Sequence, residues 1–290
     1  MSDPIPDPEF GCDLCGGREN AHLLEKSGAS YRQCSCCGLI FSAQTDRDSE
    51  RINDKYFAEE IAKYAAKHYS HKKQLVYSRK LKLFAPYRKL NRLLEVGANV
   101  GGFVHRAKRE GWEAFGVEPV AACCDYARDH HDLKMFNALL EEAHLPERSF
   151  DAVYSNAVFE HLPSPSRVLE EIKRVLRPGG VVFIDTVNWA SYTRENLGAR
   201  WRLVDPTHHL VLYTPQTLRR YCEKAGLRVI RLATHGVRFR ENSRPLPRGM
   251  ARVADELRKF PLSLATRFNR KGDSIDVLAR RPESADSTHS

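Results

Sequence analysis

The stretch LLEVGANVGG, from Leu93 to Gly102, decides how this chain of 290 residues is interpreted. Its apolar run carries the acid Glu95 and leads into a glycine-rich turn, and a later apolar run, FGVEP, contains Glu118 at its end. Glycines let a backbone approach a bound ligand, and an acid at the end of the next strand accepts hydrogen bonds from both ribose hydroxyls. This layout predicts a nucleoside-cofactor site on a parallel sheet.

The turn itself, GANVGG, distinguishes between cofactor classes. A dinucleotide site places a pyrophosphate at the start of the helix that follows such a turn. Here the turn contains no cationic residue, and Glu95 would repel a phosphate but suits a ligand with an amino group. Asn99 replaces the middle glycine, which is tolerated because Asn adopts left-handed backbone conformations readily. The expected cofactor contacts are Glu95, Gly97, Asn99, Gly101 and Glu118.

Hydrophobic periodicity predicts an α/β fold with a doubly wound, mostly parallel, Rossmann-like sheet of seven strands. The strands are expected at 92–97, 114–118, 134–137, 150–155, 180–186, 227–233 and 274–280. Helices are expected at 101–110, 120–129, 165–176 and 215–226. Pro165 suits the first turn of its helix, and Ser164 is the expected cap. The stretch 238–272 is expected to be largely helical.

From about Asn91 to Thr186 the chain resembles the class I S-adenosylmethionine-dependent methyltransferases. Four motifs in family order carry the resemblance: the glycine-rich turn, the acid Glu118, SFDAVYSNAVFEHLPSP at 149–165 and VLRPGGVVFIDTVN at 175–188. The resemblance implies S-adenosylmethionine as the cofactor, with the turn facing its methionine part and Glu118 binding its ribose. It also implies contacts to the adenine, for which the matching residues are Leu140 and Glu141. The residue that the resemblance places near the sulfonium is Asn156.

Two Cys-x-x-Cys-Gly pairs lie near the N-terminus, and they consist of Cys12 with Cys15 and Cys34 with Cys37. The two-residue spacer lets both thiolates of a pair point at one ion, and four thiolates make a closed, tetrahedral structural zinc site. The glycine after each pair favours Cys37 over its neighbour Cys36, which is close enough to substitute. We therefore expect a zinc ribbon over residues 11–42, with short strands near 21–24 and 39–41. The alternatives are unliganded cysteines and a redox disulfide.

Outside the ribbon, the chain is expected to form a helical linker or lid at 46–89, a cofactor domain at 90–281 and a disordered tail at 282–290. In members of the family that the chain resembles, the corresponding segment often lies over the cofactor. Its Tyr56, Tyr64 and Tyr69 are therefore candidates for cofactor contacts or for core packing. The acidic, proline-rich N-terminus is unlike a signal peptide, and no apolar run approaches the ~20 residues that span a bilayer. A cytoplasmic protein is expected.

Methyl transfer from a sulfonium requires an aligned acceptor and, where the acceptor carries a proton, a base such as histidine. Two candidates follow predicted strands: His161 in FEHLP and His209 in DPTHHLVLYTP. His209 matches a substrate-facing histidine of the resembling family, whereas His161 is a second candidate that can instead hold the loop through backbone hydrogen bonds. Some quinone-pathway O-methyltransferases bind a divalent metal at a similar Glu-His pair. They need an acid where this chain has Ala157, so no catalytic metal is expected.

Four aromatic residues are expected either to line the acceptor pocket or to lie in the core, namely Trp189, Tyr192, Trp201 and Tyr213.

The net charge of +9, with arginines concentrated at 219–281, indicates either a solvated face or a nucleic-acid footprint. The leading hypothesis is a methyltransferase acting on a sugar, glycan precursor or secondary metabolite. An RNA methyltransferase is the alternative. It is disfavoured because the chain has no Asn/Asp-Pro-Pro-Tyr/Phe motif and because acids offset the basic residues of the ribbon. A third hypothesis is a non-catalytic scaffold that binds S-adenosylmethionine. No motif indicates the acceptor atom or the oligomeric state.

Overall fold

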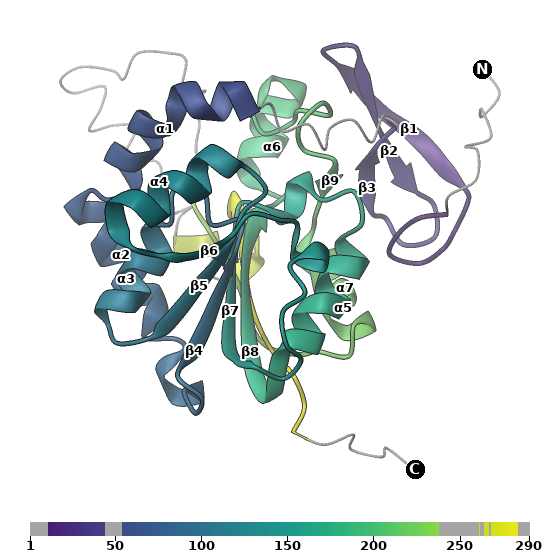
Figure 1. Cartoon of the computed structure of the whole chain (residues 1–290). Helices are drawn as coiled ribbons and strands as arrows, with labels where there is room; N and C mark the ends of the chain where they lie inside the picture. Colours follow the sequence, from purple (N-terminus) through teal and green to yellow (C-terminus); the bar gives the residue numbers. More distant parts are fainter. Residues whose placement is uncertain (1–10, 44–53, 238–260, 262–263, 267, 284–290) are drawn as a thin grey trace.

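The computed structural model describes residues 11–43, 54–237, 261, 264–266 and 268–283, and its strands form two sheets (Figure 1). The larger sheet has the order β10-β11-β8-β7-β4-β5-β6, and the smaller has the order β1-β2-β3-β9. The larger sheet consists of β4 (Arg92–Val96), β5 (Glu113–Val117), β6 (Lys134–Phe136), β7 (Phe150–Asn156), β8 (Leu176–Val187), β10 (Arg228–His235) and β11 (Ser274–Arg280). The smaller sheet consists of β1 (Asn20–Lys26), β2 (Ala29–Cys34), β3 (Ile40–Ser42) and β9 (Val211–Leu212).

The larger sheet is mostly parallel, which confirms the predicted doubly wound α/β fold. β4 pairs in parallel with β5 and β7, β5 with β6, and β7 with β8, whereas β11 is antiparallel to both β8 and β10. The carboxyl ends of the five parallel strands therefore lie along one edge, which is where such sheets bind ligands. β8 begins four residues before its predicted start because Leu176 already pairs with Phe150 of β7.

Helices cover both faces of this sheet, so alternate residues of its strands enter two different cores. α5 (Pro165–Val175) and α7 (Pro215–Lys224) pack on the face to which Val182 of β8 contributes. α2 (His71–Leu81) and α3 (Gly102–Arg109) pack on the opposite face, together with the next residue, Phe183. α4 (Ala121–His131) lies beside α1 (Asp54–His68) at the edge of the molecule (Figure 1).

The ribbon has one more strand than expected, β2, and its sheet is completed by β9 from the cofactor domain. The predicted cap of α5 is wrong. Ser164 precedes the helix, but its side chain makes no capping hydrogen bond. Instead, a carboxylate of the ribbon, Asp13, accepts a hydrogen bond from the Ser166 amide at 3.0 Å. An acid at a helix N-terminus satisfies an otherwise unpaired amide, so the ribbon caps a helix of the other unit.

The predicted helical linker forms α1, α2 and the short 3-10 helix η2 (Ala85–Tyr87), and it docks on the glycine-rich turn. Tyr69 donates its hydroxyl to the Val100 carbonyl at 2.7 Å, and Gln74 donates to the Gly102 carbonyl at 3.0 Å. A Cβ at Gly102 would lie 2.7 Å from the Cβ of His68, so only glycine permits this approach.

Parts of three predicted segments lie outside the described residues. These are 46–53 and the Tyr56 side chain in the linker, most of the predicted helical stretch 238–272, and the tail from 284 onward. Within the second of these, 264–266 and 268–269 are helical. In the part of the chain that is described, no helix is long and apolar enough to cross a bilayer.

Candidate functional site

The glycine-rich turn adopts the left-handed backbone that its composition predicts. Gly97, Asn99 and Gly101 have φ values of 69°, 49° and 76°. A Cβ at Gly97 would lie 2.3 Å from Cγ2 of Val158, so this glycine lets the loop after β7 approach the turn. A Cβ at Gly101 would lie 2.6 Å from Leu133, so this glycine serves the packing of α3 against the end of α4. Gly97 therefore allows close packing at the edge of the sheet where ligands bind, and Gly101 allows close packing in the core.

The two acids predicted for the cofactor lie beside this turn in different environments. Glu118 accepts hydrogen bonds from the Asn99 amide at 2.8 Å and the Val120 amide at 3.1 Å, which hold its carboxylate at the end of β5. A carboxylate oxygen has two lone pairs and can accept from more than one donor. Glu95 is buried, and burial raises the pKa of its carboxyl. Its Oε2 has no hydrogen-bond partner among the described residues.

The remaining predicted cofactor residues are spread along the same edge. Asn156 ends β7 and accepts a hydrogen bond from the Tyr154 hydroxyl at 3.3 Å. The next residue, Ala157, has a φ of 55°, a left-handed conformation that costs a non-glycine residue about 1–2 kcal/mol. Glu141 is exposed in the 3-10 helix η3 (Leu140–Glu142), whereas the Leu140 side chain is buried in the core.

The two candidate histidines lie side by side, although the sequence presents them as separate alternatives. His161 belongs to the short 3-10 helix η4 (Phe159–His161), and the centres of its ring and that of His209 are 4.9 Å apart. Glu160 joins them, because one donor atom from each of the three residues lies within 4.8 Å of the others. Glu160 is buried and accepts a hydrogen bond from the Thr186 hydroxyl at 2.7 Å. We call Glu160, His161 and His209 the histidine cluster.

Backbone carbonyls determine which nitrogen of each imidazole carries the proton. Nδ1 of His209 lies 2.8 Å from the Leu203 carbonyl, and Nδ1 of His161 lies 2.8 Å from the His208 carbonyl. A carbonyl only accepts, so both Nδ1 atoms are donors, and each neutral ring keeps a lone pair on Nε2. Burial lowers the pKa of His209, which favours its neutral form. The cluster therefore presents two proton acceptors and a carboxylate.

A second polar group, which sequence reasoning missed, consists of Asp185, Asp276, His235 and Lys80. β8 and β11 place the two acids opposite each other, and Lys80 Nζ lies 3.2 Å from each oxygen of Asp276. Burial and the neighbouring Asp276 raise the pKa of the Asp185 carboxyl. Two nitrogens of His235 lie 3.7 Å from the acids. The available signal was a charged residue, Asp185, inside the apolar run VVFIDTV.

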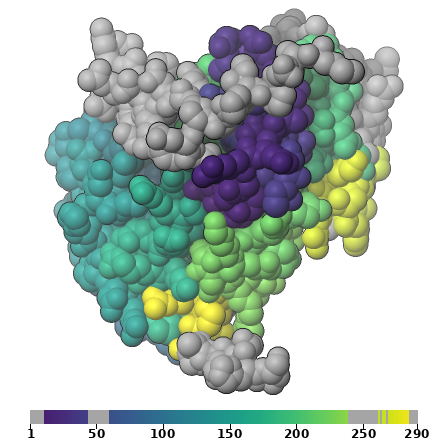
Figure 2. Space-filling model, turned by 90° about the vertical axis from the view of Figure 1, so that its right-hand side faces the viewer, coloured from purple at the N-terminus to yellow at the C-terminus, as the bar shows by residue number. Residues whose placement is uncertain are grey.

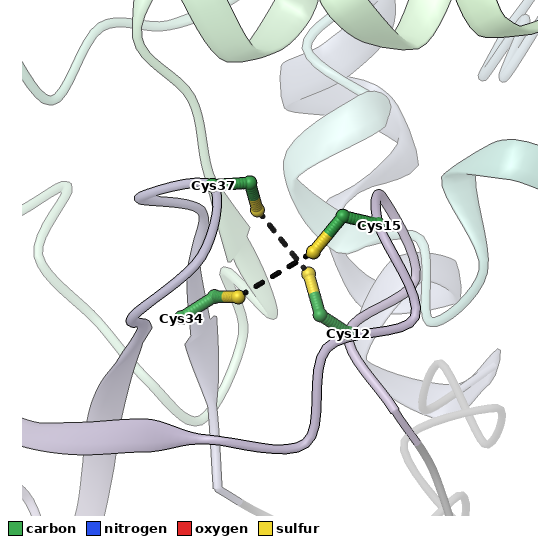
Figure 3. A group of neighbouring side chains, drawn as sticks. All are labelled: Cys12, Cys15, Cys34 and Cys37. Atoms are coloured by element: carbon green, nitrogen blue, oxygen red, sulfur yellow. Dashed lines mark hydrogen bonds between the residues drawn. The ribbon is translucent and has the colours of Figure 1, made fainter.

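The four predicted zinc ligands come together at one end of the ribbon, with their sulfur atoms directed at a common point (Figure 3). The Sγ atoms of Cys12 and Cys37 are 3.5 Å apart, and those of Cys15 and Cys34 are 3.6 Å apart. Tetrahedral thiolates with zinc–sulfur bonds of 2.3 Å have sulfur atoms about 3.8 Å apart, so the donor set fits zinc. Cys36 is exposed and is not part of the group.

Two predicted aromatic walls belong to the core instead. Tyr213 is fully buried and donates its hydroxyl to the Phe159 carbonyl at 2.9 Å. This hydrogen bond holds the first residue of η4. Trp201 is 2% exposed and packs with residues of the ribbon. Trp189 and Tyr192 remain partly exposed.

A family model described as a methyltransferase domain matches residues 69–232, more than half of the chain. An Aeromonas salmonicida protein named ubiquinone biosynthesis O-methyltransferase is 31% identical over 150 residues, which cover 48% of this chain and 63% of that protein. A Serratia marcescens protein named malonyl-[acyl-carrier protein] O-methyltransferase is 29% identical over 129 residues, which cover 43% of this chain and 49% of that protein. The chain thus matches less than two thirds of the length of these relatives.

Similarity to solved structures extends over more of the chain. Phosphoethanolamine N-methyltransferase 2 of Haemonchus contortus, solved with S-adenosyl-L-methionine, has a TM-score of 0.57 at 16% identity. The match covers 90% of this chain and 71% of that one. At such identity the similarity shows the fold alone.

Proposed function

The chain belongs to the class I S-adenosylmethionine-dependent methyltransferases, and from this premise we propose that it transfers a methyl group from S-adenosylmethionine to a small-molecule acceptor. The observation that carries the proposal is the histidine cluster. Its Glu160 and His161 follow β7 after a loop whose Val158 packs on Gly97 of the glycine-rich turn, and His209 lies beside them. The glycine-rich turn and the two proton-accepting histidines thus lie at the same edge of the larger sheet.

The residues at the turn suit S-adenosylmethionine, which supplies an electrophilic methyl group when bound. Glu118 would accept hydrogen bonds from the ribose hydroxyls at the end of β5. The unpartnered Oε2 of Glu95 is a buried acceptor that a cofactor ammonium group would satisfy, which removes the cost of an unpaired buried polar atom. Asn156 would lie near the sulfonium, and the backbone around Leu140 with Glu141 would border the adenine.

His209 is the proposed base. Its Nδ1–H is engaged by the Leu203 carbonyl, so its Nε2 is available to accept a proton from the acceptor. A base in hydrogen-bond reach of the reacting group accelerates proton transfer by about 10²–10⁴-fold. His161, held by the His208 carbonyl, presents a second Nε2 beside it and is the alternative base.

The names of the two relatives, both O-methyltransferases, support an oxygen acceptor. An RNA acceptor is the alternative, and it draws on the net charge of +9. A scaffold that binds S-adenosylmethionine without turnover is the second alternative, and the histidine cluster argues against it.

The test is methyl transfer from isotope-labelled S-adenosylmethionine into host extract, separated into small-molecule, RNA and protein fractions. The wild type is compared with His209→Ala, Glu118→Ala and the control His22→Ala, which changes an exposed histidine of β1. We expect label in the small-molecule fraction, loss of transfer in the first two variants and no loss in the control. Label in RNA would establish the alternative. Cofactor binding without transfer into any fraction would favour the scaffold.

The same reactions are run with EDTA and with added Mg²⁺, because the spacing within the histidine cluster can also accommodate a metal ion. We expect added Mg²⁺ neither to raise transfer nor to restore any transfer that EDTA removes, since no acid stands at Ala157. Loss of transfer with EDTA and recovery with Mg²⁺ would instead make the cluster a metal site.

We also propose that Cys12, Cys15, Cys34 and Cys37 hold a structural zinc ion. Metal analysis of the purified protein should give one zinc per chain. Cys34→Ser should lower that content, whereas Cys36→Ser, the matched change of an exposed cysteine, should leave it unchanged. Equal loss in both variants would contradict this assignment of ligands.

A further inference from the structure

The loop that carries His209 is attached to the ribbon rather than only to its own domain. The Tyr31 hydroxyl of β2 donates to the His209 carbonyl at 2.7 Å. Ser42 of β3 donates its amide to the Leu210 carbonyl at 2.8 Å and its hydroxyl to the Pro206 carbonyl at 2.7 Å. Immediately after this loop, β9 pairs with β3 in an antiparallel ladder. We call residues 201–210 the histidine loop.

Apolar packing joins the same two segments. One buried cluster contains residues of the ribbon and of the cofactor domain, namely Tyr31, Ile40, Val187, Trp201, Val204 and Leu212. Tyr31 and Ile40 are fully buried, and Lys26 of β1 donates to the Trp201 carbonyl at 3.0 Å. Figure 2 shows the ribbon in purple lying against the light green segment that includes α7. The ribbon therefore packs directly against the histidine loop.

The histidine loop in turn orients both imidazoles. The carbonyl that accepts from His209 Nδ1 belongs to Leu203, and the one that accepts from His161 Nδ1 belongs to His208. Both carbonyls lie in the segment that the ribbon holds. A shift of this segment would release the Nδ1–H of each ring, and the proton could then move to Nε2. Imidazole orientation and tautomer thus depend on contacts made by the ribbon.

A second attachment fixes the ribbon from the other side. The loop between Cys12 and Cys15 contacts α5 and α7, where the Asp13 carboxylate binds Ser166 and Lys224 Nζ donates to the Asp13 and Leu14 carbonyls at 3.1 and 2.9 Å. A unit as small as residues 11–43 does not build a sufficient core by itself, and such units are usually held together by a metal. Two of the four zinc ligands, Cys12 and Cys15, flank this attachment.

We infer that the ribbon is the positioning element of the active site, and that Tyr31 and Ser42 are positioning residues that set the tautomer and orientation of His209 and His161. The inference rests on the proposed function only in so far as His209 acts on the acceptor. The contacts of the ribbon described above are with the histidine loop, α5 and α7, so we expect it to govern the chemical step rather than cofactor affinity.

The test compares Tyr31→Phe and Tyr31→Phe/Ser42→Ala with the control Lys224→Met. The first two remove hydrogen bonds from the ribbon to the histidine loop and leave the ring of residue 31 in place. The control removes the two hydrogen bonds from the ribbon to α7 and leaves the histidine loop attached. Zinc content is measured for each protein, and S-adenosylmethionine affinity is measured by calorimetry.

The direct measurement is the ¹⁵N chemical shifts of the histidine rings, with His209 and His161 assigned through their alanine variants. We expect a single Nδ1–H tautomer for both rings in the wild type and the control. The double variant should show a mixture, with zinc content and cofactor affinity unchanged. Methyl transfer into the small-molecule fraction should fall about tenfold in kcat, with little change in the KM for S-adenosylmethionine.

Unchanged ring shifts in the double variant would overturn the inference, whatever happens to activity. So would an equal change in the Lys224→Met control, because that result would show general destabilisation. If the ring shifts change as expected but His209→Ala retains full methyl transfer, the positioning role stands and the proposed base is wrong. The two failures are therefore distinguishable.

Discussion

At the scale of single residues, the site depends on backbone conformations that few side chains tolerate. Asn99 occupies a left-handed position with its Oδ1 accepting a hydrogen bond from the Val100 amide at 2.8 Å, which compensates for part of the strain. Gly97 has no such compensation available, since any Cβ there would collide with Val158. The left-handed conformation of Asn99 could be predicted from the residue type alone. The collision partner is 61 positions away in the chain and became visible only in three dimensions.

Gly97→Ala should therefore abolish cofactor binding. Gly28→Ala is its matched control, because Gly28 also has a left-handed φ, of 79°, but a Cβ there would meet nothing within 4 Å. The control should lose about 1 kcal/mol of unfolding free energy through backbone strain alone. Gly97→Ala should lose a further 1–3 kcal/mol, roughly, through overpacking. Urea unfolding and calorimetry with S-adenosylmethionine measure both effects, and equal losses in the two variants would contradict the role of Val158.

The pH dependence of methyl transfer should reflect the environment of His209. Burial lowers its pKa from 6.5, so its Nε2 remains unprotonated as the pH falls through 6.5 and is lost as a base only below its lowered pKa. The acid limb of kcat/KM, which reports the free enzyme, should thus have a midpoint below 6.5. His161→Asn should leave an acid limb in place if His209 is the base. A limb that disappears in this variant would transfer the role to His161.

At the scale of elements, the linker helices are joined to the cofactor turn through His68 at the end of α1. Its Nδ1 lies 2.6 Å from the Tyr77 hydroxyl of α2, and its Cβ faces Gly102 of α3. Burial lowers the pKa of His68 to about 4. One histidine thus stands where three helices meet, and its charge state is coupled to their packing.

This coupling predicts that stability falls with acid. In the unfolded chain His68 takes up a proton near pH 6.5, whereas the folded state resists protonation until about pH 4, so stability is full above 6.5 and declines as the pH falls toward 4. At pH 5 the cost should be about 1–2 kcal/mol. His68→Asn, which keeps a partner for Tyr77, should flatten this decline in urea unfolding measured at pH 7 and pH 5. His130→Asn, an exposed change on α4, should not.

At the scale of the whole molecule, the two edges of the large sheet have different tasks. The carboxyl edge carries the turn and the histidine cluster, while the opposite edge carries the buried pair Asp151 and Arg177, whose nearest atoms are 2.5 Å apart. Asp151 also accepts hydrogen bonds from the amides of Leu90 and Arg92, which tie the start of β4 to the start of β7. This edge should support stability rather than chemistry.

Asp151→Asn should therefore destabilise the protein by about 3 kcal/mol, because it leaves Arg177 buried beside a neutral group. Its control, Glu110→Gln, breaks the more exposed pair with Arg106 and should cost less than about 1 kcal/mol. Methyl transfer measured well below the unfolding temperature should stay within twofold of the wild type in both. A large loss of transfer in folded Asp151→Asn would contradict the division of tasks between the two edges.

The sequence by itself determined the elements of the large sheet, mostly within a few residues, along with the cysteine pairs and the cofactor turn. These features are encoded by neighbours along the chain: apolar periodicity, Cys-x-x-Cys spacing, and glycines where a left-handed backbone is required. Only the tertiary structure decided that His161 and His209 share one cluster, that Asp13 caps α5, and that β9 completes the ribbon sheet. These contacts join residues between 48 and 172 positions apart. They depend on how whole surfaces pack, which no local pattern records.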